Sequence, residues 1–436
     1  MVNFALMPKY EGYVNSGYEW VGEIPRSWEL TKLGSCLSPV SIKNCPELPL
    51  LSITRELGVI ERDIEDQDSN HNFIPDDLSG YKKLEKGQFG MNKMKAWQGS
   101  YGVSKYTGIV SPAYFVFNFT KAINPEFFNW AIRSKLYVSF FGSASDGVRI
   151  GQWDLSKDRM KAIPFILPPE EEQIQIANFL VQKTEQIDEA IALKEQQINL
   201  LKERKQVITQ KAVTQGLEPN VSMKDSGVTW IGKIPEHWEL TKLGSCLSPV
   251  SIKNCPDLPL LSITRELGVI ERDIEDQDSN HNFIPDDLSG YKKLEKGQFG
   301  MNKMKAWQGS YGVSKYTGIV SPAYFVFNFT KAINPEFFNW AIRSKLYVSF
   351  FGSASDGVRI GQWDLSKDRM KAIPFILPPE EEQIQIANFL VQKTEQIDEA
   401  IALKEQQIEK IKEYKTTLIN SVVTGKIKIS PEMVKR

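Results

Sequence analysis

The sequence contains few of the residues that build metal sites or disulfide frameworks. Its 436 residues include four cysteines and three histidines. Cys36 and Cys45 are nine residues apart, as are Cys246 and Cys255, and no C-x-x-C motif is present. Structural zinc usually needs four ligands at tight spacing, so we expect no metal site and interpret the cysteines as buried free thiols.

Long hydrophobic runs are also missing. The longest apolar stretches, such as SPAYFVFNF, are far shorter than the roughly 20 residues of a membrane-spanning helix. The N-terminus lacks a basic segment followed by an apolar one, so we expect a cytoplasmic protein without a membrane partner. A net charge of −1 argues against a grip on nucleic acid by bulk positive charge, but a local basic patch or a partner that adds charge remains open.

The motifs of common catalytic sites are absent from the sequence. It has no P-loop, no G-x-S-x-G, no H-E-x-x-H and no Asn-Pro-Pro-aromatic motif. The acidic run ERDIEDQDSNHNFIPDD would suit a metal-dependent nuclease, but a solvated acidic loop with His71 as a polar surface residue is the favoured interpretation. We therefore predict a chain that is not an enzyme by itself and has no catalytic residues.

The sequence is dominated by an internal repeat with an offset of 210 residues. Residues 28–198 match residues 238–408 with one difference, Glu47 against Asp257. Each copy has a lead-in of the pattern SG-x-x-W-x-G-x-I-P-x-x-W, a large domain and a long helical segment. A period this long excludes a solenoid, and one domain made twice is indicated. The predicted segments are a lead-in (1–28), a first domain (29–166), a first long helix (167–216), a linker with the second lead-in (217–238), a second domain (239–376), a second long helix (377–426) and a tail (427–436).

The two helical segments carry a heptad seam. Pro168 and Pro169, followed by three glutamates, predict a helix start. From Leu180, steps of alternately four and three residues follow a seam that is mainly apolar, with Thr184, Lys194 and Lys205 as its polar members. The predicted helix-pairing residues are Leu180, Ile187, Ile191, Ile198, Leu201 and Ile208 in the first helix and Leu390, Ile397, Ile401, Ile408, Ile411 and Leu418 in the second. Helices of about 45 residues, roughly 65–70 Å long, cannot bury such a seam alone, so we expect them to pack together within the chain. The alternative is that each lies on its own domain or on another subunit.

Residues 30–165 predict a mixed domain of strands and helices. The β-rich runs LPLLSIT, GIVSPAYFVFNF and KAIPFIL alternate with glycine, proline and asparagine breaks. One helix, PEFFNWAIRSKLYVSFF, is expected after Asn124 as its N-cap. The fold class is therefore α+β, with two mixed domains and two long helices.

Charge within the repeat is uneven. Residues 47–85 hold ten acidic and four basic residues, whereas residues 86–161 hold eleven basic and four acidic ones. The basic half includes MNKMKAWQGSYGVSK, in which lysines suit phosphates and Asn and Gln suit base edges, while its glycines favour a loop that inserts into a groove. The candidate DNA-binding residues are Asn92, Lys93, Lys95, Gln98, Ser100, Tyr101, Ser104, Lys105, Tyr106 and Arg149 in the first copy and Asn302, Lys303, Lys305, Gln308, Ser310, Tyr311, Ser314, Lys315, Tyr316 and Arg359 in the second. An ordinary basic surface loop is the alternative.

The lead-in pattern W-I-G-x-I-P-x-x-W, the helix start LPPEEEQIQI and the helix ends AVTQG and VVTGK together resemble the specificity subunits of type I restriction–modification enzymes. The resemblance covers nearly the whole chain. It implies two target-recognition domains joined by two long antiparallel helices in a coiled-coil-like, pseudo-two-fold spacer, with each domain reading half of a split DNA site. It also implies two modification subunits that bind S-adenosylmethionine and methylate adenine, and two restriction (motor) subunits that use ATP and Mg²⁺, with no cofactor in this chain.

The family's two recognition domains generally differ, whereas these two are nearly identical. Identical readers related by a two-fold axis are expected to bind inverted copies of one half-site, and therefore an interrupted palindrome. The half-site centres are expected about 34 Å apart or slightly more, which is one turn of DNA. The alternative function is a non-catalytic scaffold whose twin domains bind protein.

Overall fold

The computed structural model describes residues 7–62, 74–149, 152–272, 284–359 and 362–434. For the described residues within 146–153 and 356–364, only the backbone is described. Within this part of the chain two compact units are found, residues 1–194 with 405–436 and residues 195–404. The acidic run and His71, considered above for a nuclease, lie largely or wholly outside the described residues. None of the described helices combines the length and apolar character needed to cross a bilayer.

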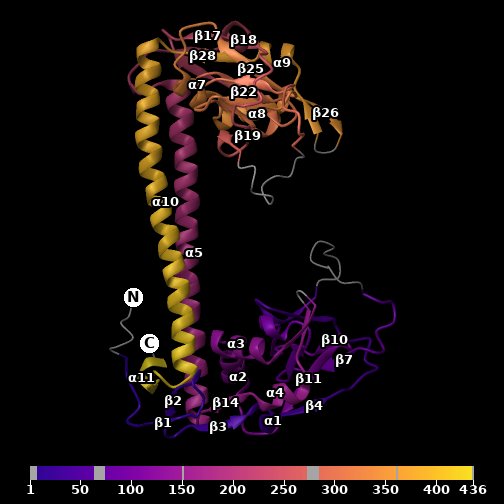
Figure 1. Cartoon of the computed structure of the whole chain (residues 1–436). Helices are drawn as coiled ribbons and strands as arrows, with labels where there is room; N and C mark the ends of the chain where they lie inside the picture. Colours follow the sequence, from indigo (N-terminus) through magenta and orange to yellow (C-terminus); the bar gives the residue numbers. More distant parts are fainter. Residues whose placement is uncertain (1–6, 63–73, 150–151, 273–283, 360–361, 435–436) are drawn as a thin grey trace. The chain divides into compact units, whose positions relative to one another are not determined.

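The domains of the two units contain the same elements in the same order (Figure 1), and the first unit also contains the short helix α11 (Pro431–Val434). The first unit has β1 (Tyr13–Asn15), β2 (Glu23–Pro25), β3 (Glu29–Lys32), α1 (Leu33–Cys36), β4 (Leu37–Val40), β5 (Leu51–Thr54), β6 (Gly58–Glu61), β7 (Lys82–Leu84), β8 (Phe89–Asn92), η2 (Ala96–Gln98), β9 (Tyr101–Val103), β10 (Gly108–Val110), β11 (Tyr114–Phe119), α2 (Pro125–Ile132), α3 (Lys135–Ala144), β12 (Asp146–Arg149), β13 (Gln152–Asp154), α4 (Lys157–Ala162) and β14 (Pro164–Leu167). The second unit has β15 (Met223–Asp225), β16 (Lys233–Pro235), β17 (Glu239–Lys242), α6 (Leu243–Cys246), β18 (Leu247–Val250), β19 (Leu261–Thr264), β20 (Gly268–Glu271), β21 (Lys292–Leu294), β22 (Phe299–Asn302), η3 (Ala306–Gln308), β23 (Tyr311–Val313), β24 (Gly318–Val320), β25 (Tyr324–Phe329), α7 (Pro335–Ile342), α8 (Lys345–Ala354), β26 (Asp356–Arg359), β27 (Gln362–Asp364), α9 (Lys367–Ala372) and β28 (Pro374–Leu377).

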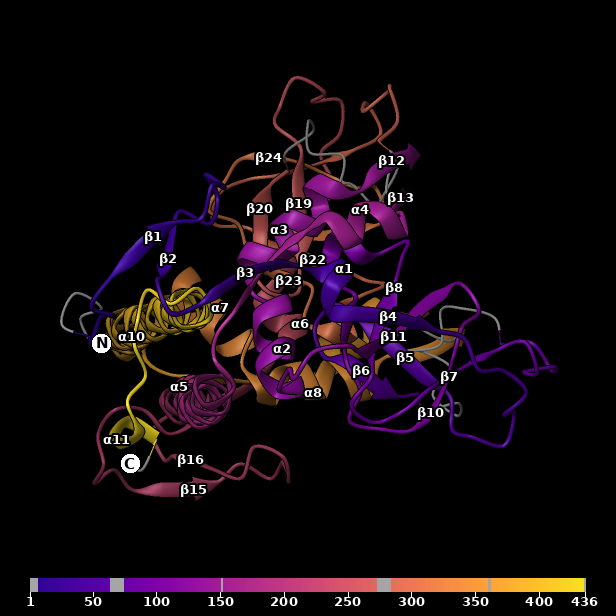
Figure 2. The same ribbon diagram turned by 90° about the horizontal axis from the view of Figure 1, so that it is seen from below.

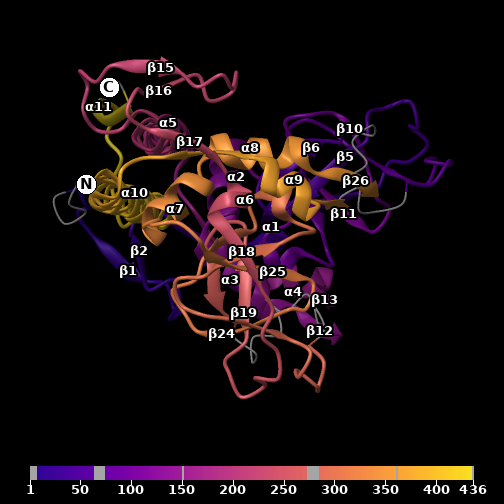
Figure 3. The same cartoon turned by 90° about the horizontal axis from the view of Figure 1, so that it is seen from above.

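Each domain is organised around a four-stranded antiparallel sheet. Its order is β4-β11-β8-β9 in the first unit, where β4 and β11 are seen side by side in Figure 2, and β18-β25-β22-β23 in the second, part of which is seen in Figure 3. On one face Phe117 belongs to the main aromatic core with α2 and α3, and on the other Val116 packs with Ile53 and Leu84 in a smaller cluster. This alternation along β11 is what a strand buried on both faces requires. The expected α+β class is confirmed.

The predicted helix after Asn124 is two helices. Asn124 accepts the Phe127 N–H at 2.9 Å, as expected of an N-cap. The helix then ends at Ile132, because Ser134 leaves the helical conformation and its side chain accepts the Tyr137 N–H to cap α3. The expectation of one continuous helix was therefore wrong, since a second N-cap interrupts it.

The two long helices are α5 (Glu170–Gln215) and α10 (Glu380–Val423), with 46 and 44 residues. In each unit, half of α5 packs antiparallel against half of α10. In the first unit Lys415 Nζ lies 2.6 Å from Asp188 Oδ1, and in the second Lys205 Nζ lies 2.6 Å from Asp398 Oδ2. All twelve predicted helix-pairing residues are buried or half-buried, so the packing of the helices within the chain is confirmed.

A joint of three residues fixes the start of one long helix to the end of the other. In the first unit the Trp28 Nε1–H donates to Glu172 Oε2 at 3.0 Å, and the Trp28 ring lies against Gly425 at the end of α10. In the second unit Trp238, Glu382 and Gly216 are arranged in the same way. The lead-in is therefore part of the core of each unit and not a separate segment, and the joint explains why the three sequence patterns occur together.

The cysteines are free, but only half of them are buried. Cys36 and Cys246 are buried, and burial raises their pKa above the ordinary thiol value. Cys45 and Cys255 are half-buried, so the expectation of four buried thiols was wrong for these two. They lie in the connection after β4 and its copy, where the chain runs over the surface.

Candidate nucleic-acid interface

The segment that the sequence analysis singled out does not form one loop. Lys93, Lys95 and Gln98 lie in the connection between β8 and β9, whereas Lys105 and Tyr106 follow β9. Because β8 and β9 are antiparallel neighbours, the two groups lie at opposite ends of the hairpin. The expectation that the segment forms one loop was therefore wrong, and the two groups must be considered separately.

Four of the ten candidate residues in each copy are buried and stabilise the hairpin. Asn92 Oδ1 accepts the Met94 N–H at 3.2 Å, and Ser104 Oγ donates to the Tyr106 carbonyl at 2.7 Å. The Tyr101 ring is fully buried with its centroid 4.5 Å from that of Phe141. The buried residues are Asn92, Ser100, Tyr101 and Ser104, with Asn302, Ser310, Tyr311 and Ser314 as their copies. Their assignment to DNA contact is corrected, because side chains enclosed by the fold cannot reach a base edge.

The first group includes Lys93, which belongs to a lysine cluster that the sequence did not predict. Lys82 and Lys157 lie over the half-buried ring of Phe115 on β11, and the charges of Lys43, Lys93 and Lys157 act on Lys82; we call these four lysines the Phe115 lysine cluster. Lys157 Nζ lies 4.9 Å and Lys82 Nζ 6.0 Å from the centroid of the ring. The Lys82 ammonium also donates to the Tyr114 carbonyl at 2.7 Å, which fixes it at the start of β11.

The cluster concentrates positive charge at one place on the domain. The pKa of Lys82 is lowered, first by burial and then by the ammonium groups of Lys157, Lys43 and Lys93. A bound anion offsets the repulsion among these ammonium groups, and phosphate oxygens accept hydrogen bonds from ammonium groups. The cluster is therefore suited to hold a nucleic-acid backbone, with an aromatic ring beside two of its cations.

The hairpin that carries Arg149 is attached to this cluster. Lys93 Nζ lies 3.5 Å from Asp154 Oδ1 at the end of β13, and the Leu155 N–H donates to the Lys93 carbonyl at 3.4 Å. Arg149 lies on the paired strand β12, and its side chain is outside the described part of the structure. The fold thus brings Lys93 and the Arg149 hairpin together, although they are 56 residues apart in the sequence.

The second unit repeats the cluster with the same geometry. Lys292 Nζ lies 6.0 Å and Lys367 Nζ 4.9 Å from the Phe325 centroid, and Lys292 donates to the Tyr324 carbonyl at 2.7 Å. The pKa of Lys292 is lowered by burial and then by Lys367, Lys253 and Lys303. Gln308 and Lys305 lie in the connection before β23, as their copies do before β9, and Arg359 lies on β26 with its side chain undescribed.

The other end of the hairpin has a weaker basic character. Lys105 is exposed, and its Nζ lies 3.9 Å from Glu126 Oε1 in the first turn of α2. Tyr106 is also exposed, with 38% of its surface accessible. This end combines one cation with one carboxylate, so it offers less net charge to a phosphate than the cluster does.

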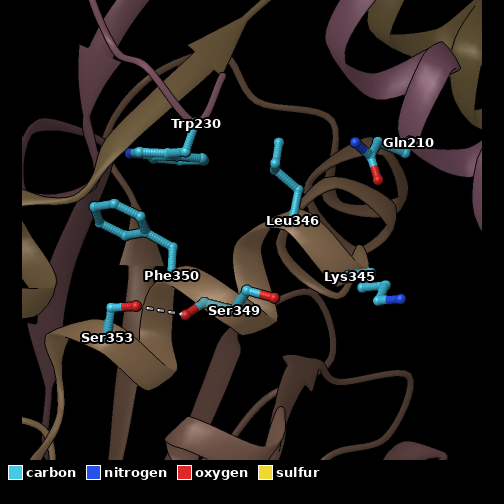
Figure 4. A pocket seen from close by; sticks show the side chains of 7 residues that line it. All are labelled: Gln210, Trp230, Lys345, Leu346, Ser349, Phe350 and Ser353. Carbon is cyan, nitrogen blue, oxygen red and sulfur yellow. Dashed lines mark hydrogen bonds between the residues drawn. The ribbon is translucent and has the colours of Figure 1, made fainter. Parts of the chain in front are cut away.

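A pocket beside the lead-in of the second unit is a further candidate site (Figure 4). Trp230 and Phe350 form one wall, with ring centroids 4.1 Å apart, and Gln210 and Lys345 lie at the other side. Its residues include one cation and no carboxylate, so it holds no acid–base pair. Throughout the described residues, no group of three or more His, Cys, Asp or Glu side chains is placed to hold a metal ion.

Comparisons with known proteins agree on one family. The family model of the type I restriction modification DNA specificity domain matches residues 304–413. Over 295 residues the chain is 27% identical to a protein of Methanocaldococcus jannaschii assigned to the type I restriction enzyme MjaX as its specificity subunit, a match that spans 64% of this chain and 63% of the relative.

Two solved structures share the fold over nearly the full length. A chain from a study of complex assembly and conformational transition of the type I R-M system matches with a TM-score of 0.65 and 13% identity, covering 92% of this chain and 98% of that chain. The HsdS subunit from Thermoanaerobacter tengcongensis matches with a TM-score of 0.54 and 15% identity, covering 95% and 100%. At such identities the matches establish the fold alone.

Proposed function

Because the chain belongs to the family of type I restriction–modification specificity subunits, we propose that it is the DNA-reading subunit of such a complex. The observation that carries the proposal is the Phe115 lysine cluster and its copy around Phe325, which present the same four cations and the same ring in both units. Phosphate contacts of this kind position a protein on the duplex, and base contacts from neighbouring side chains then specify the sequence.

The base contacts are proposed to come from the residues that lie next to the cluster. Lys95 and Gln98 follow Lys93 in the connection before β9, and Arg149 lies on the attached hairpin. Arginine pairs bidentately with guanine and glutamine with adenine in the major groove. Lys105, whose ammonium faces Glu126, and Tyr106 lie at the far end of the hairpin and are not part of the proposed contact.

The target is proposed to be an interrupted palindrome. The two reading domains differ only at Glu47 and Asp257 over residues 28–198 and their copies. In each unit α5 and α10 are antiparallel. Each domain is attached at the same joint, where the start of one long helix meets the end of the other. Identical domains attached in this way are suited to inverted copies of one half-site.

The chemistry is proposed to belong to partner subunits. Two modification subunits would bind S-adenosylmethionine and methylate adenine, and two restriction subunits would use ATP and Mg²⁺. The absence of catalytic motifs from the sequence supports a chain that positions these partners and does not itself react.

The proposal is tested by selection of duplexes from a randomised DNA library with the purified full chain. The expected result is enrichment of two short sequence blocks separated by a spacer of fixed length, with affinity that falls steeply as salt rises. A variant with Lys157→Gln and Lys367→Gln should recover the same blocks with lower affinity, because it loses phosphate contacts and not base contacts. A pool without enriched sequence, or binding that salt does not weaken, would favour a protein scaffold.

A further inference from the structure

A short exposed segment lies beside the Phe115 lysine cluster. Residues 41–44, with the sequence SIKN, follow β4, and all four are exposed. β4 ends where Val40 pairs with Val116, the residue after Phe115 on β11. The segment therefore leaves the sheet next to the strand position that carries the aromatic ring of the cluster. We call residues 41–44, together with their copy at 251–254, the β4 loop.

The backbone of the β4 loop is held at two points. The Lys83 N–H donates to the Ile42 carbonyl at 2.8 Å, and Lys83 lies in β7. The Asn44 N–H donates to the Ser79 carbonyl at 3.0 Å. A loop that is fixed through its backbone holds its side chains in place before a ligand arrives, which lowers the entropic cost of binding.

Asn44 has a backbone conformation that is rare for a residue with a side chain. Its φ is 62° and that of Asn254 is 61°, and within the described residues no other non-glycine residue has a positive φ. Asparagine usually tolerates this conformation through a local hydrogen bond of its side chain. In the part of the chain that the structure describes, the exposed Asn44 amide makes no such bond. The amide is therefore free to pair with a ligand.

The β4 loop and the connection before β9 border the same cation. The pKa of Lys82 is lowered first by burial and then by neighbouring ammonium groups, which include those of Lys43 and Lys93. Asn44 follows Lys43 directly, and Ile42, which is 46% exposed, precedes it. A duplex whose backbone lies on the cluster would therefore pass an amide and an apolar side chain that flank one of the phosphate-binding lysines.

We propose that the β4 loop reads an A·T base pair in the major groove, with the Asn44 amide on adenine and the Ile42 side chain on the methyl group of thymine. A carboxamide both donates and accepts, so it can pair with N7 and the N6 amino group of adenine together. The methyl group is an apolar contact that thymine alone offers. Lys43, between the two, holds an adjacent phosphate. The inference rests on the proposed function and adds a reading loop that the sequence did not predict.

The second unit repeats the β4 loop. The Lys293 N–H donates to the Ile252 carbonyl at 2.8 Å, and Ile252 is 45% exposed. The Asn254 N–H donates to the Ser289 carbonyl at 3.1 Å. Both half-sites are therefore expected to contain the A·T pair.

The test repeats the duplex selection with the purified full chain and its variants. Asn44→Gly with Asn254→Gly removes both amides and keeps the loop, because glycine adopts the observed φ freely. Its preference for A·T should fall about tenfold or more at one position in each selected block, with the other positions unchanged. Its denaturant midpoint should be no lower than that of the wild type. The matched control in the same loop, Lys43→Gln with Lys253→Gln, should weaken binding to all sequences and keep every base preference.

The single variant Asn44→Gly connects the loop to one half-site, because it should relax the A·T position in one of the two blocks only. Relaxation in both blocks or in neither would overturn the inference. A double glycine variant that selects the same blocks as the wild type, or that loses preference at all positions alike, would also overturn it and leave the proposed function intact. A wild type that selects no blocks would overturn the inference and the proposed function together.

Discussion

Salt dependence of DNA binding tests the lysine clusters quantitatively. The Phe115 lysine cluster and its copy beside Phe325 each have four lysines, eight together. If each neutralises one phosphate, the slope of log affinity against log salt is about −7, since each contact contributes about 0.9. Affinity should then fall about 10⁴-fold between about 50 and 200 mM salt.

The perturbation is the double variant Lys157→Gln and Lys367→Gln. Loss of two phosphate contacts should make the slope shallower by about 1.8, so that the same salt range costs about 10³-fold. Each ammonium lies 4.9 Å from the centre of its phenylalanine ring, so glutamine removes the charge and retains much of the side-chain contact.

The assay is anisotropy of a labelled duplex that carries the selected site, measured across the salt series. The matched control is Lys105→Gln with Lys315→Gln, which removes the same two charges from the opposite end of the hairpin. Its slope should equal that of the wild type. An unchanged slope for the cluster variant, or an equal change in the control, would refute the placement of the DNA backbone on the cluster.

Three further predictions concern the fold. Gly425→Ala should destabilise the first unit by about 3 kcal/mol, because the φ of 73° at Gly425 disfavours a side chain and the adjacent Pro25 ring leaves no room for a methyl group. Gly17→Ala is the control and should cost about 1 kcal/mol, because Gly17 has a φ of 75° but open space around it. The midpoints of denaturant unfolding compare the two variants. Asn124→Ala should lower the stability measured in the same way by about 1 kcal/mol through loss of the N-cap of α2, and Asn124→Ser should retain most of it. A thiol reagent should modify Cys45 and Cys255 rapidly in the native chain and the remaining two thiols only on unfolding, and four equally reactive thiols would contradict their burial.

The helical framework could be predicted from the sequence because its signals are local and repeated. The heptad seam from Leu180 and the three glutamates at the start of α5 identify a helix of the observed length. In the sequence, the joint between the ends of the two long helices could be recognised only as three separate patterns, because nothing in the sequence shows that Trp28 donates to Glu172. The break at Ser134 was missed because the apolar pattern continues through it.

The candidate site was predicted only in part. Lys93 was found because it lies in a short basic and aromatic segment, but Lys43 and Lys82 precede the basic half of the repeat and join Lys93 and Lys157 only through the fold. The same segment led to a wrong assignment of Tyr101 to DNA contact, because the pairing of β8 with β9 places that ring in the core. Charge patterns identify a region, and strand pairing decides which of its side chains face outward.

The central claim, that two identical domains read one half-site twice, is tested most directly by a methylation map. The chain is expressed with its modification subunit in cells that lack adenine methylation, and modified adenines are located by long-read sequencing. The account predicts one split palindrome, methylated on both strands. A split motif whose two halves differ would contradict it, because domains that differ only at residue 47 and its copy could not then be reading the same sequence.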